Sequence, residues 1–263
     1  MKNKKVYYAV SILVCGLLFL SAGKPGKVWD FAEVEKGNFV CRHEVTNEEY
    51  RTFLNDLTAK GKTDKLIIAI YDSSQWITKF PKASNDPMFK MYHSHPAYNS
   101  YPIVNITLEA AQLYCEWLTE KMNALTKDKM IIGLPTDKEW RKISAPLPGN
   151  NLPWYGSFAY EPNKEKLMLT NVKFMDYASE HTNYICDGGV YTVPVKHYPP
   201  NQTGIYDIIG NVAEMTSDGK QKGGSWDNFI EECMVDKEQH YILPDPRVGF
   251  RIVAKNLSLS ARK

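Results

Sequence analysis

Residues 204–214, which read GIYDIIGNVAE, are the part of the sequence that decides the fold. Two glycines divide this stretch into short apolar pieces, and Gly210 permits a sharp turn between them. The same pattern fills the second half of the chain, where Gly, Pro, Asn and Asp separate short aromatic or β-branched pieces such as residues 190–195 and 249–253. From about residue 146 onward we therefore expect short strands and irregular loops rather than helices.

Three helices are predicted in the first half by the residues at which they begin. Thr46 and Glu49 form a capping box, and apolar residues then recur at helical spacing. A second helix is expected from Thr107 to about Met122, and a short third helix follows another capping box at residues 135–140. Because no repeat, low-complexity tract or linker divides the chain after residue 30, we expect these helices and the strands that follow to form one domain.

The N-terminus carries the features of an export signal. Lysines precede an uncharged run over residues 6–23, which ends in the small residues Ser21, Ala22 and Gly23. Cleavage after Gly23 is one interpretation. The other is an uncleaved anchor, because the run just reaches the lower length limit of a membrane-spanning helix. We expect residues 1–23 to be a signal peptide or N-terminal anchor, and residues 24–263 to be an extracytoplasmic domain, whether periplasmic, envelope-associated or secreted.

Charge and cysteine content narrow the possible partners and cross-links. With 32 basic and 30 acidic residues the formal charge is only +2. We therefore expect no nucleic-acid partner, and membrane contact only through an uncleaved N-terminal segment. The mature chain would keep Cys41, Cys115, Cys186 and Cys233, and an oxidising compartment permits disulfides among them in three possible pairings that the sequence does not rank. Cys115 falls on the apolar side of a predicted helix, where we expect it to be buried.

Six regions of the chain, taken together and in their order, make it similar to the formylglycine-generating-enzyme (sulfatase-modifying factor) family. Each region alone is a weak signal, but together they cover about residues 30–255. They are EVTNEEY at 44–50, YPIVN at 101–105 with AAQLYCEWL at 110–118, LPTDKEW at 134–140, GIYDIIGNVAE at 204–214, GGSW at 223–226 and VGFR at 248–251. The resemblance implies a compact α+β domain of the formylglycine-generating-enzyme (C-type-lectin-like) fold, with little regular secondary structure and often with bound calcium.

The resemblance also implies two classes of function. Family members that are enzymes oxidise a cysteine of sulfatases to formylglycine, using molecular oxygen and copper held by two cysteines five residues apart. Other members are non-catalytic, including lipoproteins of bacterial gliding and secretion machines. The residues at the copper position therefore matter more for the function than the fold does.

The copper position is incomplete in this sequence. Cys233 matches the family's second copper cysteine, but Asn228 stands at the first, and an amide oxygen is a poor ligand for Cu(I). Ser225 matches a residue of the active pocket, while Ala213 replaces the tryptophan that active members carry before the glutamate. One interpretation is an oxidase with an altered metal site, in which Cys233 and Ser225 are catalytic. The other, which we favour, is a pocket that has lost this chemistry.

Two groups of residues match the family's calcium positions. The first consists of Asn171, Val172, Asp187 and Gly189, and the second of Asp207, Gly210, Val212 and Glu214. The side chains or backbone carbonyls of all eight offer oxygen, which is the ligand atom that Ca²⁺ requires. The alternative is that Asp207 and Glu214 cap turns and pair with lysines.

These observations predict a non-catalytic binding or scaffold domain, stabilised by calcium, in a bacterial envelope, with gliding or type IX secretion machinery as the family precedent. A protein or peptide partner is expected, because an irregular surface rich in Trp and Tyr suits recognition. The alternative is a formylglycine-generating oxidase or a related metal-dependent oxidase that uses Cu(I). A third possibility is an enzyme of unrelated chemistry in the same pocket, again built on Ser225 and Cys233.

Overall fold

The computed structural model describes residues 30–81, 86–126, 129–144, 152–153, 169–176, 181–183 and 188–260. The predicted signal or anchor at residues 1–23 lies outside these ranges, as do Cys186 and Asp187. Among the helices that are described, none combines the length and the apolar character needed to cross a membrane.

All three predicted helices are present, as α1 (Asn47–Ala59), α5 (Leu108–Leu125) and α6 (Asp137–Ser144). The predicted capping box of α1 is formed, since the Glu49 N–H donates to Thr46 Oγ1 and the Thr46 N–H donates to Glu49 Oε2. Several helices that the sequence did not predict are too short to show a helical period. They are α2 (Thr63–Ala69), α3 (Gln75–Lys79), α4 (Asp86–Met91), α7 (Leu257–Ser260) and the 3₁₀ turns η1 (Pro96–Tyr98) and η2 (Ile230–Glu232).

Two four-stranded sheets organise the domain. The first is antiparallel and has the order β1-β2-β10-β3, formed by β1 (Phe31–Glu35), β2 (Asn38–Cys41), β10 (Val253–Asn256) and β3 (Met130–Gly133). The second has the order β8-β7-β6-β9, formed by β8 (Gln239–His240), β7 (Lys220–Lys222), β6 (Ala213–Met215) and β9 (Val248–Gly249), with β6 and β9 parallel. A separate hairpin joins β4 (Phe174–Asp176) to β5 (His181–Asn183). The domain therefore contains both helices and sheets, which confirms the α+β class.

One predicted strand is wrong. Residues 190–195 form no strand, because this segment is held by side chains and loops rather than by a neighbouring strand. The Val193 N–H donates to Asn211 Oδ1, and the Val195 N–H donates to the Ser100 carbonyl. The prediction for residues 249–253 is partly right, since β9 ends and β10 begins inside it.

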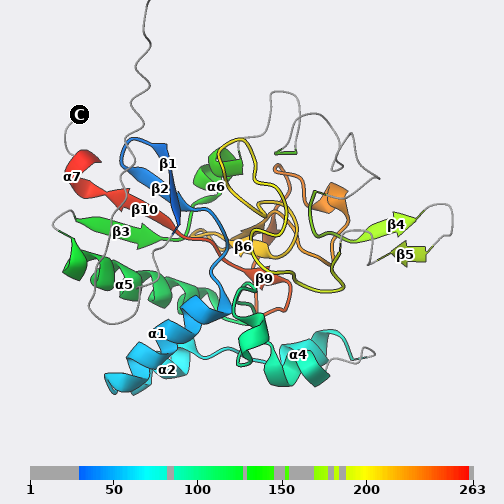
Figure 1. Cartoon of the computed structure of the whole chain (residues 1–263), viewed down its shortest axis with the longest axis horizontal. Coiled ribbons are helices and arrows are strands. Elements are labelled where there is room, and N and C mark those ends of the chain that lie inside the picture. Colours follow the sequence, from blue (N-terminus) through cyan, green and yellow to red (C-terminus); the bar gives the residue numbers. More distant parts are fainter. Residues whose placement is uncertain are drawn as a thin grey trace, which may run out of the picture.

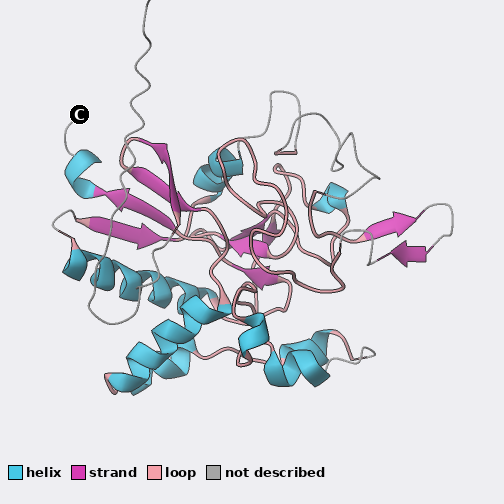
Figure 2. Ribbon diagram, in the orientation of Figure 1, coloured by secondary structure: helices cyan, strands magenta, loops and turns pink. Residues whose placement is uncertain are grey.

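The main apolar core lies around α5, which packs against the first sheet on one side and against α1 on the other (Figure 1). Aromatic rings fill its centre: Tyr50 stacks on Tyr114 with centroids 5.8 Å apart, and Phe53 meets Tyr114 edge-on at 5.6 Å. Cys115 is buried in this core, as predicted. Figure 2 shows helices and the strands of the first sheet on this side of the molecule, whereas the region around β6 is mostly loop.

Among the described cysteines there is no disulfide. Cys41, Cys115 and Cys233 are all free and buried. Burial raises the pKa of the Cys41 thiol to about 12, and it also raises the pKa of the other two thiols.

Candidate functional site

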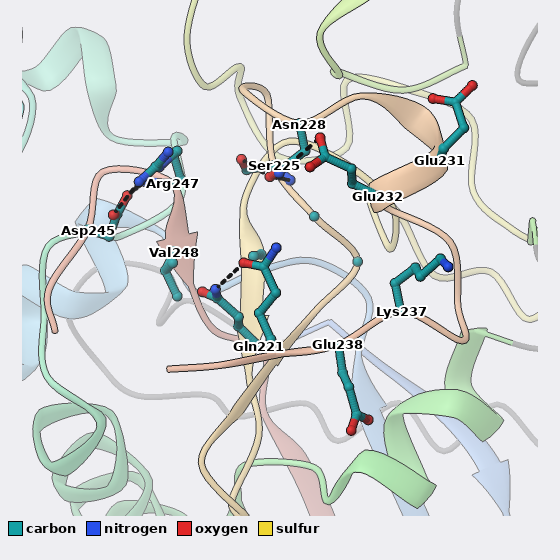
Figure 3. A pocket seen from close by; sticks show the side chains of 14 residues that line it. Gln221, Ser225, Asn228, Glu231, Glu232, Lys237, Glu238, Asp245, Arg247 and Val248 are labelled. Carbon is teal, nitrogen blue, oxygen red and sulfur yellow. Dashed lines mark hydrogen bonds and ion pairs between the residues drawn. The ribbon is translucent and has the colours of Figure 1, made fainter. Parts of the chain in front are cut away.

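A pocket of about 490 Å³ opens beside the second sheet, at the position where the family resemblance places the active site. Its wall combines the glycine-rich segment 223–225, the 3₁₀ turn η2, the segment leading into β8, and the start of β9. Figure 3 shows Ser225, Asn228 and Glu232 on one side of this space and Arg247 with Asp245 on another. The structure thus brings the sequence-predicted residues Ser225 and Asn228 into one pocket.

Asn228 closes the turn that forms one side of the pocket. Its Oδ1 accepts hydrogen bonds from Ser225 Oγ at 2.7 Å and from the Ser225 N–H at 3.1 Å. The Asn228 N–H donates back to the Ser225 carbonyl at 3.0 Å. A turn of this kind is what an asparagine side chain stabilises well. The residue at the first copper position therefore has a structural task.

Ser225 is not arranged as a nucleophile. Its side chain is buried, its hydroxyl donates to Asn228, and the same oxygen accepts the Asp227 N–H at 3.3 Å. A reactive serine needs a general base within hydrogen-bond reach of its hydroxyl. The described residues that line the pocket include no histidine, and the Ser225 hydroxyl has the Asn228 amide oxygen as its acceptor.

Cys233 lies behind the pocket wall rather than in it. The thiol is completely buried, donates to the Phe229 carbonyl at 3.3 Å, and packs so tightly under Gly224 that a Cβ on that glycine would lie 2.2 Å from Sγ. Burial, followed by the nearby charge of Glu232, raises the pKa of this thiol well above its usual value. Since the thiolate is the metal-binding and nucleophilic form, this environment opposes both roles.

The charged residues at the pocket are mostly acidic. Arg247 is already neutralised, because its guanidinium makes two 2.8 Å hydrogen bonds to Asp245 and a 3.3 Å contact with Asp227. Four acidic side chains and two basic ones belong to the lining: Glu231, Glu232, Glu238, Asp245, Lys237 and Arg247. Glu231 lies on the exposed rim, and Figure 3 shows it on the same side of the pocket as Lys237.

Behind the pocket lies a buried polar network that includes the second predicted calcium group. Glu214 is fully buried, but its carboxylate is bound elsewhere: Arg251 Nη2 donates to Oε1 at 2.6 Å and Trp140 Nε1 donates to Oε2 at 2.8 Å. Asp207 differs, because Oδ2 accepts the Lys196 N–H at 2.6 Å while Oδ1 is buried without a hydrogen-bond partner. Burial raises the pKa of Asp207 to about 6. One oxygen of Asp207 is thus available to a ligand, whereas the Glu214 carboxylate is bound by Arg251.

Glu44 is the residue that sequence reasoning missed. Its side chain is fully buried, Oε1 accepts from Asn211 Nδ2 at 2.9 Å, and Oε2 has no partner. Burial raises its pKa well above the usual range, and the charge of Asp207 is the next largest cause. Only a weak sequence signal marks Glu44, namely its position directly before the apolar Val45 and the helix cap at Thr46.

The first predicted calcium group is brought together in part. Asn171 is buried, its Nδ2 donates to the Tyr191 carbonyl at 2.8 Å, and its Oδ1 has no partner. Gly189 lies beside it, since a Cβ there would lie 3.3 Å from Asn171 Nδ2. Val172 is buried, and Asp187 lies outside the described residues.

The donor atoms of this network suit a hard cation. The three partnerless atoms on Glu44, Asp207 and Asn171 are all oxygens, and oxygen is what Ca²⁺ takes as ligand. Within the described ranges, no group of three or more His, Cys, Asp or Glu side chains is close enough to hold a metal. Any cation here would therefore need backbone or amide oxygens, such as those of Gly210, Val212 and Asn171, in addition to carboxylates.

Comparison with known families decides the identity of the fold. Residues 32–256 match the family model described as the sulfatase-modifying factor enzyme 1-like domain. The chain belongs to this family. This confirms the resemblance that the six sequence regions indicated.

Relatives of this sulfatase-modifying-factor domain include proteins named as active enzymes and proteins named as inactive ones. A bovine (Bos taurus) protein named inactive C-alpha-formylglycine-generating enzyme 2 is 29% identical over 48% of this chain and 38% of its own length. A mouse (Mus musculus) protein named formylglycine-generating enzyme is also 29% identical, over 46% of this chain and 28% of its own length. The matched region thus spans less than half of each relative.

Among solved structures, PvdO from Pseudomonas aeruginosa is similar to this family member with a TM-score of 0.56 and 16% sequence identity. The match covers 83% of this chain and 80% of PvdO. At this level of identity the likeness shows a common fold and does not transfer a function.

Proposed function

We propose that this chain is a non-catalytic binding or scaffold domain of the sulfatase-modifying-factor family, on the extracytoplasmic side of a bacterial envelope. The observation that carries the proposal is Asn228. It stands at the first copper position, and its amide is used to close the 225–228 turn. An amide oxygen does not replace a soft thiolate in binding Cu(I).

The second copper position supports the same conclusion. Cys233 is present, but its thiol is buried under Gly224 and its pKa is raised. Two-coordinate thiolate binding would require a second thiol to approach it. Of the other described cysteines, Cys41 and Cys115 belong to the apolar core around α5, whereas Cys233 packs in a different apolar cluster with Trp140.

The pocket, rather than aromatic residues on the surface, is the site that we assign to a partner. Of the Trp and Tyr side chains expected at the surface, Trp76, Trp117, Trp140 and Trp226 are buried, whereas Tyr71, Tyr98 and Tyr101 are partly exposed. The charged residues of the pocket lining are mostly acidic, and Glu231 is exposed at its rim. A protein or peptide segment with a cationic side chain is the partner that these charges favour. Membership of a gliding or type IX secretion machine would be one setting for such a domain.

The test of the non-catalytic proposal is the Cu(I) affinity of the reduced domain, measured in competition with a chromogenic chelator. Wild type and Cys233→Ser should bind Cu(I) equally weakly. Asn228→Cys serves as the matched control, because it restores the pair of cysteines five residues apart. Tight one-to-one binding by wild type that disappears in Cys233→Ser would overturn the proposal, and would favour the alternative of a formylglycine-generating oxidase that uses Cu(I).

The test of the pocket uses random peptide display. Peptides selected on the wild-type domain should be enriched in Lys and Arg, and they should lose binding to Glu231→Lys. Enrichment that ignores this charge reversal would contradict the assignment of the partner to this pocket.

We also propose a structural Ca²⁺ behind the pocket, held by Asp207, by Glu44 and by backbone carbonyls of the 207–214 segment, with Asn171 serving the neighbouring predicted site. The charge of Asp207 raises the pKa of the buried Glu44, and a cation held by both carboxylates would stabilise their ionised forms. Calorimetric titration of chelator-treated protein should show Ca²⁺ binding that is weakened in Glu44→Gln. Equal binding by wild type and variant would remove Glu44 from the site.

A further inference from the structure

We propose that Asn211 is a positioning residue that makes the shape of the pocket depend on the cation site. This inference rests on the cation proposed above, and it adds a regulatory role that a purely structural ion would not have. In it, binding of the cation orders segment 207–214, and that segment holds the glycine-rich wall of the pocket in place.

Two backbone hydrogen bonds join the cation segment directly to the pocket wall. The Gly210 N–H donates to the Gly223 carbonyl at 2.9 Å, and the Trp226 N–H donates to the Asn211 carbonyl at 3.0 Å. These bonds flank the stretch that contains Gly224 and Ser225, both of which line the pocket. The pocket wall is therefore attached at both ends to residues 210 and 211.

Asn211 connects this attachment to Glu44 of the proposed cation site and to Asn171 of the first predicted calcium group. Its Nδ2 donates to Glu44 at 2.9 Å, and its backbone N–H donates to the Asn171 carbonyl at 2.8 Å. It is fully buried and has a φ of 55°, a left-handed conformation that Asn tolerates better than most residues. Movement of Glu44 or Asn171 is thus transmitted to the residue that holds Trp226.

The segments that join the cation site to the pocket wall are closely packed. A Cβ on Gly210 would lie 2.3 Å from the Asn171 carbonyl oxygen, and a Cβ on Gly223 would lie 2.6 Å from the Ile208 carbonyl oxygen. Gly224 in turn lies directly on Cys233. Closely packed elements move together rather than deform gradually. Loosening of segment 207–214 should therefore uncover the Cys233 thiol.

Cys233 provides a built-in reporter of this loosening. The reduced protein is treated with iodoacetamide under native conditions, in Ca²⁺ and in chelator, and labelling of each cysteine is followed by mass spectrometry. Chelation should raise the labelling rate of Cys233 by about tenfold, within the range typical of coupled sites. Cys115 is the internal control, because it lies in the apolar core around α5, whereas Cys233 packs in a different apolar cluster. Its rate should not change.

Two variants test whether the charge of Glu44 controls the exposure of Cys233. Glu44→Gln keeps an acceptor for Asn211 but removes one charge, so Cys233 in Ca²⁺ should label as fast as in chelated wild type. Glu109→Gln is the matched control, because Glu109 is exposed in the first turn of α5. It should behave as wild type in both conditions.

The outcomes distinguish this inference from the cation proposal. Calorimetry that detects Ca²⁺ binding, with no change in Cys233 labelling on chelation, overturns the coupling and leaves the cation site. No Ca²⁺ binding at all overturns both. A parallel increase at Cys115 and Cys233 also overturns the coupling, since it shows that chelation destabilises the whole domain rather than the pocket wall.

Discussion

The α1–α5 side of the molecule and the loop-rich side behind the pocket both contain a buried interior, but different interactions stabilise the two interiors. On the first side, rings such as Tyr50, Phe53 and Tyr114 pack against one another. On the second, the fully buried Arg251 bridges Glu214 and the carbonyls of Cys41 and Tyr206. Apolar packing tolerates gradual change, whereas a buried charge must keep its partners. The pocket is attached to the side that is less tolerant.

Breaking the charge network gives the largest expected effect. Arg251→Met leaves Glu214 buried with only the Trp140 hydrogen bond, so the free energy of unfolding should fall by about 3–5 kcal/mol. Urea denaturation followed by circular dichroism measures the loss. A loss below about 1 kcal/mol would mean that the network is no more demanding than a surface ion pair, and the contrast between the two sides would not hold.

A cavity in the apolar side sharpens the same contrast. Leu118 is fully buried in the α5 core, and Leu118→Ala should lower the free energy of unfolding by about 2–5 kcal/mol. The loss should be the same in Ca²⁺ and in chelator, because Leu118 is not among the residues proposed to hold the cation. Denaturation curves in both conditions test this. A loss that depends on Ca²⁺ would show that the two sides are not independent.

The pH dependence of Asp207 tests the polar side alone. Burial raises its pKa to about 6, whereas an unfolded Asp has a pKa of about 3.9. The folded protein therefore binds this proton more tightly, and the resulting stability is present in acid and lost as the pH rises through the folded pKa. In chelator, the stability of wild type relative to Asp207→Asn should fall by about 2–3 kcal/mol between about pH 4 and pH 7.

Taking the difference from Asp207→Asn removes the contribution of carboxyls that do not interact with Asp207. Glu44 adds to the difference in the same direction, because the charge of Asp207 raises its pKa. Asp137 and Asp245 have pKa values lowered by their basic partners, so their contribution changes with pH in the opposite direction. Saturating Ca²⁺ should abolish or reverse the fall, because the cation stabilises the ionised form. A difference between wild type and variant that stays constant with pH would place Asp207 in a more solvated setting.

The two sides also differ in how far the sequence predicts them. The starts of α1 and α5 follow from local signals, the capping box at Thr46 and the cap at Thr107, because helix caps involve residues only three apart. The pocket wall follows from the GGSW segment. The partners of the polar network do not, because Asn211 reaches Glu44 across 167 positions of sequence. No local pattern shows that Glu214 binds Arg251 and leaves Asp207 with a free oxygen.

The smallest expected effect comes from an ion pair that belongs to neither side. Lys142 on α6 contacts Glu35 on β1, and both side chains are more than half exposed. Water screens such a pair, so Lys142→Met should change the free energy of unfolding by less than about 1 kcal/mol. Measured beside Arg251→Met under the same conditions, it separates the effect of burial from the effect of charge. If the two substitutions cost the same, the loss in Arg251→Met would come from removing a charge anywhere on the domain, and burial would not explain why the polar side is less tolerant.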